Sequence, residues 1–255
     1  MKTIVLIHGM FMNPLCWENW IPHYQAKGYR VLAPAWPGRD QPIETLRRNY
    51  PDLESAKLKL SDVVEHMARF IQGLDEKPVI IGHSMGGLVV QLLLQRDLAA
   101  AGVAIDPAPP QGVFTTEFSF LRANFPAINP FLINQPVMMS FAHFQYAFVN
   151  SLSLQEQRAA YDRYVVPESR RVPIQSLTSA GRVDFKKSHA PLLITAGEKD
   201  HIIPASLNRT NFKKYKASES QTDFKEFVGR DHFLIGERGW EEVADTCLAW
   251  LEQIT

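Results

Sequence analysis

The sequence predicts an α/β protein with a doubly wound, mostly parallel sheet of about six strands. Two observations carry this prediction. Short apolar runs rich in Val and Ile alternate with longer segments of helical length and spacing. The length of 255 residues suits one large α/β domain with an insertion. Such an alternation is typical of a parallel sheet covered by helices on both faces.

The expected strands and helices follow one another in a regular order. The strands are Thr3–Ile7, Tyr29–Ala33, Pro78–Ile81, Gly102–Ile105, Pro191–Thr195 and Asp223–Val228. The helices are Leu15–Lys27, Leu53–Leu74, Met85–Arg96, Pro204–Tyr215 and Trp240–Gln253. Ligands of such sheets bind beyond the carboxyl ends of the strands. Residues directly after each strand are therefore the first candidates for chemistry.

A long insertion, residues 107–188, interrupts this alternation and far exceeds an ordinary loop. We expect it to form a helical cap on a core domain of residues 1–106 and 189–255. Residues 107–150 are rich in Phe and contain only Glu117 and Arg122 as charged residues, whereas residues 154–171 are highly charged. The charged part is expected to form a solvated outer helix, with the aromatic part facing the crevice and packing the cap on the core.

Composition limits the partners and the compartment. The chain contains 27 Lys and Arg against 27 Asp and Glu, so no net charge favours nucleic acid or an anionic membrane surface. Cys16 and Cys247 lie among apolar residues and are expected to be buried thiols rather than a disulfide. The start of the chain has no secretion-signal pattern, and no apolar run is long enough to span a bilayer. These features predict a cytoplasmic location.

The strongest motif is Gly82-His83-Ser84-Met85-Gly86, which follows an expected strand and opens an expected helix. This is the context that a Gly-x-Ser-x-Gly nucleophile elbow requires. Glycines allow the close backbone contacts of a sharp, strained turn. The turn raises the Ser84 hydroxyl above the sheet edge, beside the positive end of the next helix. Ser84 is therefore the candidate nucleophile.

The loop after the first strand, His8-Gly9-Met10, can supply a backbone N–H to a substrate carbonyl oxygen. We expect the Met10 and Met85 N–H groups to form an oxyanion hole through the main chain. His8 is expected to hold this loop by hydrogen bonds rather than to act as a base.

Candidate partners of Ser84 follow two later strands. Asp200 lies in the turn after Pro191–Thr195, and His232 lies after Asp223–Val228, so both reach the carboxyl edge of the sheet. In this arrangement His232 is the general base and Asp200 orients its imidazole. Asp106 also ends a strand and remains an alternative acid. No His, Asp and Glu spacing indicates a metal site, and no cofactor is expected.

The chain resembles the α/β-hydrolase superfamily, especially its compact, capped esterase and lipase-like members. The resemblance rests on His8-Gly9-Met10, the motif around Ser84, and the turns Gly197–Pro204 and Gly229–Phe233. It implies triad roles for Ser84, Asp200 and His232 in the order nucleophile, acid, histidine. The chain departs from the family pattern in two places. The sequence starts directly at the strand that leads to His8, so we expect the one or two strands that usually precede it to be missing from the sheet. After the second strand, only Pro37-Gly38 matches the usual series.

A serine nucleophile argues against the dehalogenases and epoxide hydrolases that resemble this fold but use aspartate. We favour hydrolysis of a carboxylic ester of an apolar small molecule through an acyl-enzyme. Thioester, lactone or carbon–carbon bond hydrolysis and cofactor-free perhydrolysis remain alternatives for the same residues. A ligand-binding protein that kept the fold without turnover is the non-enzymatic alternative.

Overall fold

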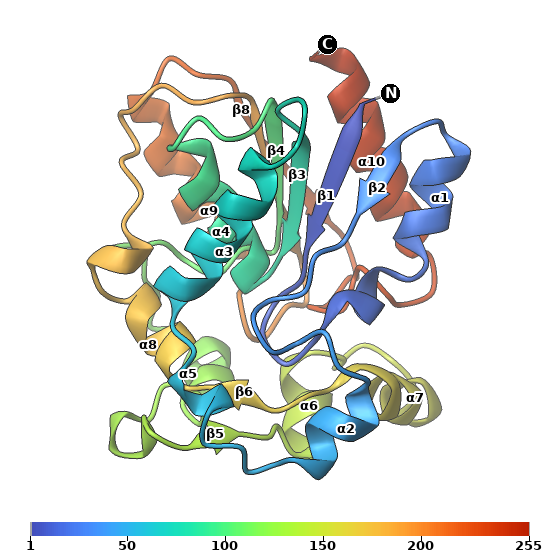
Figure 1. Cartoon of the computed structure of the whole chain (residues 1–255), viewed down its shortest axis with the longest axis vertical. Helices are drawn as coiled ribbons and strands as arrows, with labels where there is room; N and C mark the ends of the chain where they lie inside the picture. The colour runs from blue at the N-terminus through green and yellow to red at the C-terminus, as the bar shows by residue number, and fades with distance from the viewer. Residues whose placement is uncertain (1, 255) are drawn as a thin grey trace.

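The protein, seen in a computed structural model that describes residues 2–254, is built on one central sheet. This six-stranded sheet has the order β2-β1-β3-β4-β7-β8, and every neighbouring pair is parallel (Figure 1). The predicted doubly wound sheet is therefore confirmed. Its strands are β1 (Thr3–Ile7), β2 (Arg30–Leu32), β3 (Val79–His83), β4 (Ala101–Ile105), β7 (Leu192–Gly197) and β8 (Thr222–Phe227).

The direction in which the strands are added reverses between β1 and β3. The chain passes from β1 outward to β2, and then returns across β1 to build β3, β4, β7 and β8 on the other side. Crevices for ligands form at such a reversal, beyond the carboxyl ends of the strands. The residues that follow β1 and β3 therefore lie at this position.

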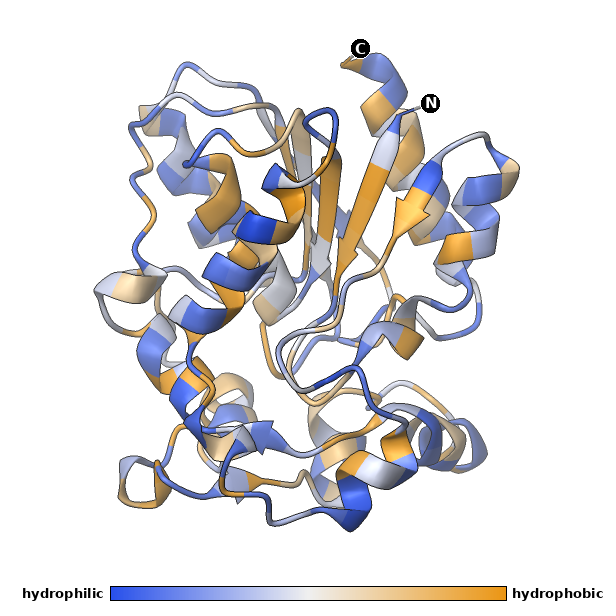
Figure 2. Ribbon diagram, in the orientation of Figure 1, coloured by the Kyte–Doolittle hydropathy of each residue, from blue (hydrophilic) through white to orange (hydrophobic). Residues whose placement is uncertain are grey.

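Burial explains why these segments read as continuous apolar runs. Every residue of β1, β3, β4 and β7 is buried, whereas the edge strands β2 and β8 are only partly buried. Strands covered on both faces cannot alternate polar and apolar side chains. The hydropathy colouring shows β1 and β3 as apolar strands between helices whose outer faces are hydrophilic (Figure 2).

Helices cover both faces of the sheet. On one side lie α3 (Leu60–Gln72), α4 (Met85–Leu94) and α9 (Ala205–Lys214), and on the other lie α1 (Trp20–Ala26) and α10 (Trp240–Gln253) (Figure 1). The helix α4 is buried along its whole length. Two hydrogen bonds hold α1 against α10 and the loop before it. Trp20 Nε1 donates to Ile235 O at 2.7 Å, and Tyr24 Oη donates to Ala244 O at 2.9 Å.

Two of the predicted helices begin later than expected. The segment Leu15–Lys27 is split into a 3₁₀ turn, Pro14–Trp17, and α1, which starts at Trp20. Pro22 lacks an N–H and is tolerated only in the first turn of a helix, so a helix that contains it must begin shortly before it. In the segment Leu53–Leu74, α3 starts at Leu60 because the Asp62 carboxylate accepts the Lys59 N–H and caps the helix there.

Residues 118–176, within the long insertion, form a layer beyond the carboxyl ends of the strands (Figure 1). The end of the insertion returns beside α4, where Gln95 Nε2 donates to Arg182 O at 3.0 Å. Two short strands in this layer, β5 and β6, pair in antiparallel fashion. The helix α2 (Ile43–Arg48), from the connection between β2 and α3, lies in the same layer (Figure 1). The other elements of the layer are α5 (Phe118–Asn124), β5 (Pro136–Val137), α6 (Phe141–Ala147), α7 (Leu154–Tyr164), β6 (Glu168–Ser169) and α8 (Arg171–Ser176).

The connection between β2 and α3 holds one side of this layer. Arg39 and Glu168 form a buried ion pair with 2.7 Å between Nη2 and Oε1. Arg47 Nε donates to Val165 O at 2.7 Å, and Ser169 Oγ donates to Ala56 O at 2.8 Å. Removing either partner of this ion pair would leave the other charge buried and uncompensated, which is destabilising.

The prediction of one solvated helix over residues 154–171 is correct only for its first part. The helix α7 ends at Tyr164, and the chain then runs extended into β6. Glu168 is 0% exposed and Arg170 only 8%. Their charges are satisfied inside the protein, by Arg39 for Glu168 and by the carbonyls of Pro126, Gln135 and Pro136 for Arg170.

Cys16 and Cys247 are both buried and free, as expected. Within the described residues 2–254, no helix combines the length and apolar character needed to cross a bilayer.

Candidate active site

Ser84 lies in the turn between β3 and α4, as the motif predicted. Its backbone has φ 57° and ψ −121°, a strained conformation for a residue with a Cβ. The Ser84 N–H donates to Ile105 O at 2.9 Å, and Ser84 O accepts the Gly87 N–H at 2.9 Å. These bonds hold the strained turn between β4 and α4. Ser84 is buried, with 7% of the residue exposed to solvent.

Close backbone contacts explain the glycines around Ser84. A Cβ at Gly86 would lie 2.3 Å from Ile7 O, so the turn packs directly on the end of β1. A Cβ at Gly9 would lie 2.8 Å from Ser84 Cβ, so the loop after β1 touches the serine itself. Only glycine permits these approaches. The loop that carries Met10 is thereby pressed against Ser84.

The predicted oxyanion donors have free N–H groups. Neither the Met10 N–H nor the Met85 N–H donates to any acceptor within residues 2–254. Met85 is the first residue of α4, where helix N–H groups have no partner and the helix end is positive. Both groups are available to a ligand oxygen near Ser84.

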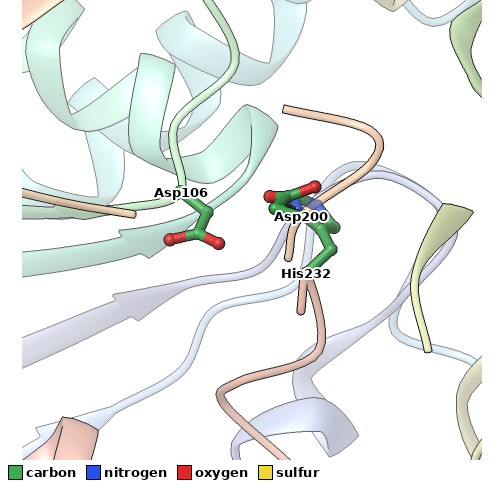
Figure 3. Close-up of side chains that lie close together, drawn as sticks. All are labelled: Asp106, Asp200 and His232. Atoms are coloured by element: carbon green, nitrogen blue, oxygen red, sulfur yellow. Dashed lines mark hydrogen bonds and ion pairs between the residues drawn. The ribbon is translucent and has the colours of Figure 1, made fainter. Parts of the chain in front are cut away.

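Asp200 and His232 are directly paired. His232 Nδ1 lies 2.6 Å from Asp200 Oδ2, and both side chains are fully buried (Figure 3). Asp200 Oδ1 accepts the N–H groups of Ile202 and Ile203, each at 2.8 Å. These bonds fix the carboxylate from the side opposite the histidine. Nδ1 of His232 therefore carries the proton, and Nε2 is left as the acceptor.

Burial keeps His232 neutral. Desolvation lowers the pKa of its imidazole, the charge of Asp231 raises it by less, and the resulting pKa is about 3. Its Nε2 atom is buried and has no hydrogen-bond partner among the described residues, Ser84 included. Two rings hold the imidazole. His83 lies 4.6 Å away between ring centroids and its Nε2 donates to His232 O at 2.8 Å, while Phe148 meets the imidazole edge-on at 4.7 Å.

Asp106 lies beside this pair (Figure 3). It is fully buried, and both of its carboxyl oxygens lie 3.1 Å from the Gly197 N–H. Burial raises the pKa of both Asp106 and Asp200, and the charge of the nearby Asp200 raises the pKa of Asp106 further. One carboxyl oxygen of Asp106 lies within 4.8 Å of one of Asp200, so the candidate acid and its predicted alternative are close neighbours.

Asp106, Asp200 and His232 also form a potential metal-binding group, with one ligand atom from each within 4.8 Å of the others. The 2.6 Å contact between His232 Nδ1 and Asp200 Oδ2 is a hydrogen bond. Two ligand atoms that each lie about 2.0–2.2 Å from one zinc ion in tetrahedral geometry stand farther apart than this. A metal would have to break the pair, so the arrangement fits a proton better than a cation.

His8 and Asp231, two nearby titratable groups, have structural partners. His8 Nδ1 donates to Gly9 O at 2.9 Å, and its Nε2 accepts the Trp36 N–H at 3.1 Å. The Asp231 carboxylate accepts the Ser151 hydroxyl at 2.6 Å and the Phe233 N–H at 3.0 Å. His8 therefore holds the loop before Met10, as expected.

The role of His8 predicts a change in stability with pH. Burial lowers its pKa in the folded protein to about 3, against 6.5 as the ordinary value. As the pH falls below 6.5, His8 of the unfolded chain binds a proton that the folded protein refuses. The wild type should then lose about 1.4 kcal/mol of unfolding free energy per pH unit relative to His8→Gln. Urea unfolding of both proteins between pH 6.5 and 4.5 measures this difference, and parallel curves would contradict it.

The aromatic part of the insertion does not face the crevice as a whole. Phe114, Phe118, Phe125 and Phe131 are exposed, with Phe131 94% exposed, so the prediction is wrong for these rings. Phe144 and Phe148 are buried, and Phe148 contacts His232. Composition alone does not separate the exposed rings from the buried ones.

An apolar cavity of about 170 Å³ lies in the inserted layer next to the loop of Met10. Phe11 lines the cavity and meets Phe148 edge-on, with 6.4 Å between the ring centroids. The other lining residues are Ala123, Pro126, Ala127, Val137, Met138, Met139, Ser140 and His143. A larger cavity of about 300 Å³ is lined by Thr3, Val79 and Ala101 at the amino ends of the strands, away from Ser84.

Comparisons with known proteins agree with this fold. A model described as the alpha/beta hydrolase family matches residues 4–246. The esterase PIR7B of Oryza sativa subsp. japonica is 32% identical over 130 residues, which cover 46% of this chain and 44% of the relative. A pyrethroid hydrolase of Sphingobium wenxiniae is 28% identical over 93 residues, which cover 36% of this chain and 30% of the relative. The chain thus spans less than half the length of these relatives.

Among solved structures, an extracellular α/β-hydrolase from a Paenibacillus species is similar in fold. It has a TM-score of 0.72 and 22% identity, and the match covers 98% of each chain. The family model covers the six-stranded sheet except Thr3, the first residue of β1, and it includes Ser84, Asp200 and His232. The protein therefore belongs to the α/β-hydrolase family.

Proposed function

We propose that the protein is a serine hydrolase that cleaves carboxylic esters, with Ser84 as nucleophile, His232 as general base and Asp200 as the orienting carboxylate. The observation that carries this proposal is the buried pair of Asp200 and His232, held 2.6 Å apart at the sheet edge that also carries the strained Ser84. The esterase and the pyrethroid hydrolase among its relatives support an ester as the substrate class.

In the first half of the reaction, His232 Nε2 takes the proton of Ser84 Oγ as Oγ bonds to the ester carbonyl carbon. The carbonyl oxygen becomes an oxyanion, which the N–H groups of Met10 and Met85 stabilise. When the oxyanion collapses, the bond to the alcohol oxygen breaks. The alcohol leaves with the proton from Nε2, and the acyl group stays on Ser84.

The second half repeats these steps with water. Water attacks the acyl carbon and gives a proton to His232 Nε2. The second collapse breaks the bond to Ser84 Oγ, which recovers the proton, and the carboxylic acid leaves. In both halves Asp200 keeps the proton of the neutral ring on Nδ1 and stabilises the imidazolium that forms.

We propose residues 107–188 as a cap on a core of residues 1–106 and 189–255. The position of this layer beyond the carboxyl ends of the strands supports the proposal (Figure 1). Phe148, from this layer, packs against His232 and contributes to the burial of its ring. The low exposure of the site favours reaction in a dry environment, where the oxyanion hydrogen bonds are strong.

We propose that the cavity next to Phe11 receives an apolar part of the substrate, taken here as the acyl chain. Its lining is mainly aliphatic, and it includes Met138 and Met139, whose flexible side chains adapt to a bound chain. Its position beside the loop of Met10 supports this assignment. Medium-length acyl groups are therefore favoured over acetate.

A panel of p-nitrophenyl esters of graded chain length, with thioesters and lactones beside them, tests this function. In the wild type, kcat/KM should rise by about fourfold per added methylene until the cavity is full, since each buried methylene contributes about 0.8 kcal/mol. Ala127→Leu fills part of the cavity and should shorten the preferred chain, with the acetate ester changed little.

Phe131→Ala is the matched control, because Phe131 belongs to the same layer but is 94% exposed. It should leave the chain-length profile as it is. A flat profile in the wild type, or one that Ala127→Leu does not alter, would remove the cavity from the substrate site. Turnover of thioesters or lactones with no turnover of simple esters would replace the proposed substrate class.

A further inference from the structure

We propose that Asp106 is a positioning residue that stays protonated and donates a hydrogen bond to Asp200, which holds Asp200 as the ionised partner of His232. This inference rests on the proposed function for its kinetic consequences. Its central claim, a neutral carboxylic acid buried beside a carboxylate, concerns the folded protein itself and is open to measurement without any substrate.

The backbone brings the two carboxyls together. Asp106 ends β4, Asp200 follows β7, and these neighbouring strands pair in parallel. The Asp106 N–H donates to Thr195 O at 3.2 Å, which extends this pairing to Asp106. A Cβ at Gly197 would lie 3.1 Å from Asp106 Oδ2, so the glycine permits the carboxyl to approach the turn. The sheet therefore brings one carboxyl oxygen of Asp106 within 4.8 Å of one of Asp200.

The hydrogen bonds decide which carboxyl holds the proton. Asp200 accepts the N–H groups of Ile202 and Ile203 on one oxygen and the Nδ1–H of His232 on the other. The Asp106 carboxyl accepts only the Gly197 N–H, shared between its two oxygens. Donors stabilise the ionised form, and two buried carboxyls within 4.8 Å of each other strongly disfavour a second charge. The proton therefore belongs on Asp106.

The surrounding charges favour the same assignment. The charged groups that act on Asp106 are Asp200 and Asp231, and both are acidic. Around Asp200 lie Asp106 and Asp231, with the neutral ring of His232 against its second oxygen. Burial and the charge of the nearby Asp200 both raise the pKa of Asp106. Burial also raises the pKa of Asp200, but the N–H groups of Ile203 and Ile202 lower it. One proton thus lets Asp200 carry the single charge that orients His232.

Asparagine is the matched replacement for a protonated Asp106. Its amide oxygen can accept the Gly197 N–H, and its amide NH₂ can donate to Asp200, as the neutral acid does. Asp106 also has φ 43°, in the left-handed region that Asn and Asp tolerate better than other residues with a Cβ. Alanine keeps neither hydrogen bond.

The first experiment compares Asp106→Asn and Asp106→Ala by their pH profiles of kcat/KM. Asp106→Asn should lose no more than about fivefold, since the amide donates a weaker hydrogen bond. In Asp106→Ala, the ionised form of Asp200 loses a hydrogen-bond donor, so the pKa of Asp200 rises. As the pH is lowered, this variant should therefore lose activity at a higher pH than the wild type does. We expect the acid limb to move upward by about one pH unit, with circular dichroism used to verify folding.

A loss in Asp106→Asn as large as that in Asp200→Asn would overturn the proposal, because it would mean that Asp106 is ionised and orients the histidine. An unmoved acid limb in a folded Asp106→Ala would also overturn it, since a merely structural role predicts that result.

The second experiment needs neither activity nor the alanine variant. The infrared difference spectrum between the wild type and Asp106→Asn at neutral pH should show a carbonyl stretch of a protonated carboxyl that comes from the wild type. Absence of this band would overturn the proposal directly. If ester hydrolysis fails but the band is present, the proposed function is wrong and the protonated Asp106 stands.

Discussion

Replacing Ser84 by alanine is expected to lower kcat for ester hydrolysis by about 10⁴- to 10⁶-fold. The change removes only Oγ, and alanine can take the same strained backbone, which bonds to Ile105 and Gly87 on both sides maintain. The fold should therefore persist, with an unchanged circular dichroism spectrum. Residual turnover would come from the Met10 and Met85 N–H groups and from binding alone.

Fluorophosphonate labelling gives the same test without a chosen substrate. The reagent should attach to the wild-type protein at Ser84, located by mass spectrometry, and not to Ser84→Ala. Ser188→Ala serves as the control, since Ser188 is exposed and hydrogen-bonds only weakly to Ser220, with 3.5 Å between their oxygens. A Ser84→Ala protein that keeps about a tenth of wild-type activity would refute the assignment, because this activity is far above the residual activity expected without the nucleophile.

Much of this architecture can be read from the sequence because the sheet is buried on both faces. The strands β1, β3, β4 and β7 are completely buried and therefore appear as apolar runs. In a parallel sheet, the residues that follow the strands lie at the same edge whatever the strand order is. This placement predicts Ser84, Asp200 and His232 as candidate site residues. The glycines around Ser84 added a mechanical signal that the close contacts with β1 explain.

The remaining features depend on contacts between distant segments. The proximity of Asp106 to Asp200 requires β4 and β7 to be neighbours, which the strand order decides and the sequence pattern does not. Glu168 and Arg170 look like surface residues, because their burial depends on partners elsewhere in the chain. The exposed Phe131 and the buried Phe148 belong to the same aromatic stretch. Local composition cannot separate such cases.

Asp200→Asn is expected to lower kcat by about 10⁴-fold, far more than Asp106→Asn. Two backbone N–H groups, from Ile202 and Ile203, point at Oδ1 of Asp200, so the amide oxygen of an asparagine must occupy that position. Its NH₂ then faces His232 Nδ1 and requires Nδ1 to accept. The ring proton moves to Nε2, which can no longer take a proton from Ser84.

The measurement is a comparison of kcat for Asp200→Asn and Asp106→Asn on one ester, with both variants checked for folding. At position 106 the amide reproduces both hydrogen bonds of a protonated acid, whereas at position 200 it reverses the one that orients the base. The two substitutions are chemically identical and fall on neighbouring buried carboxyls, so a general disturbance of packing affects both alike. The reverse ranking would make Asp106 the orienting acid and leave Asp200 as its protonated neighbour.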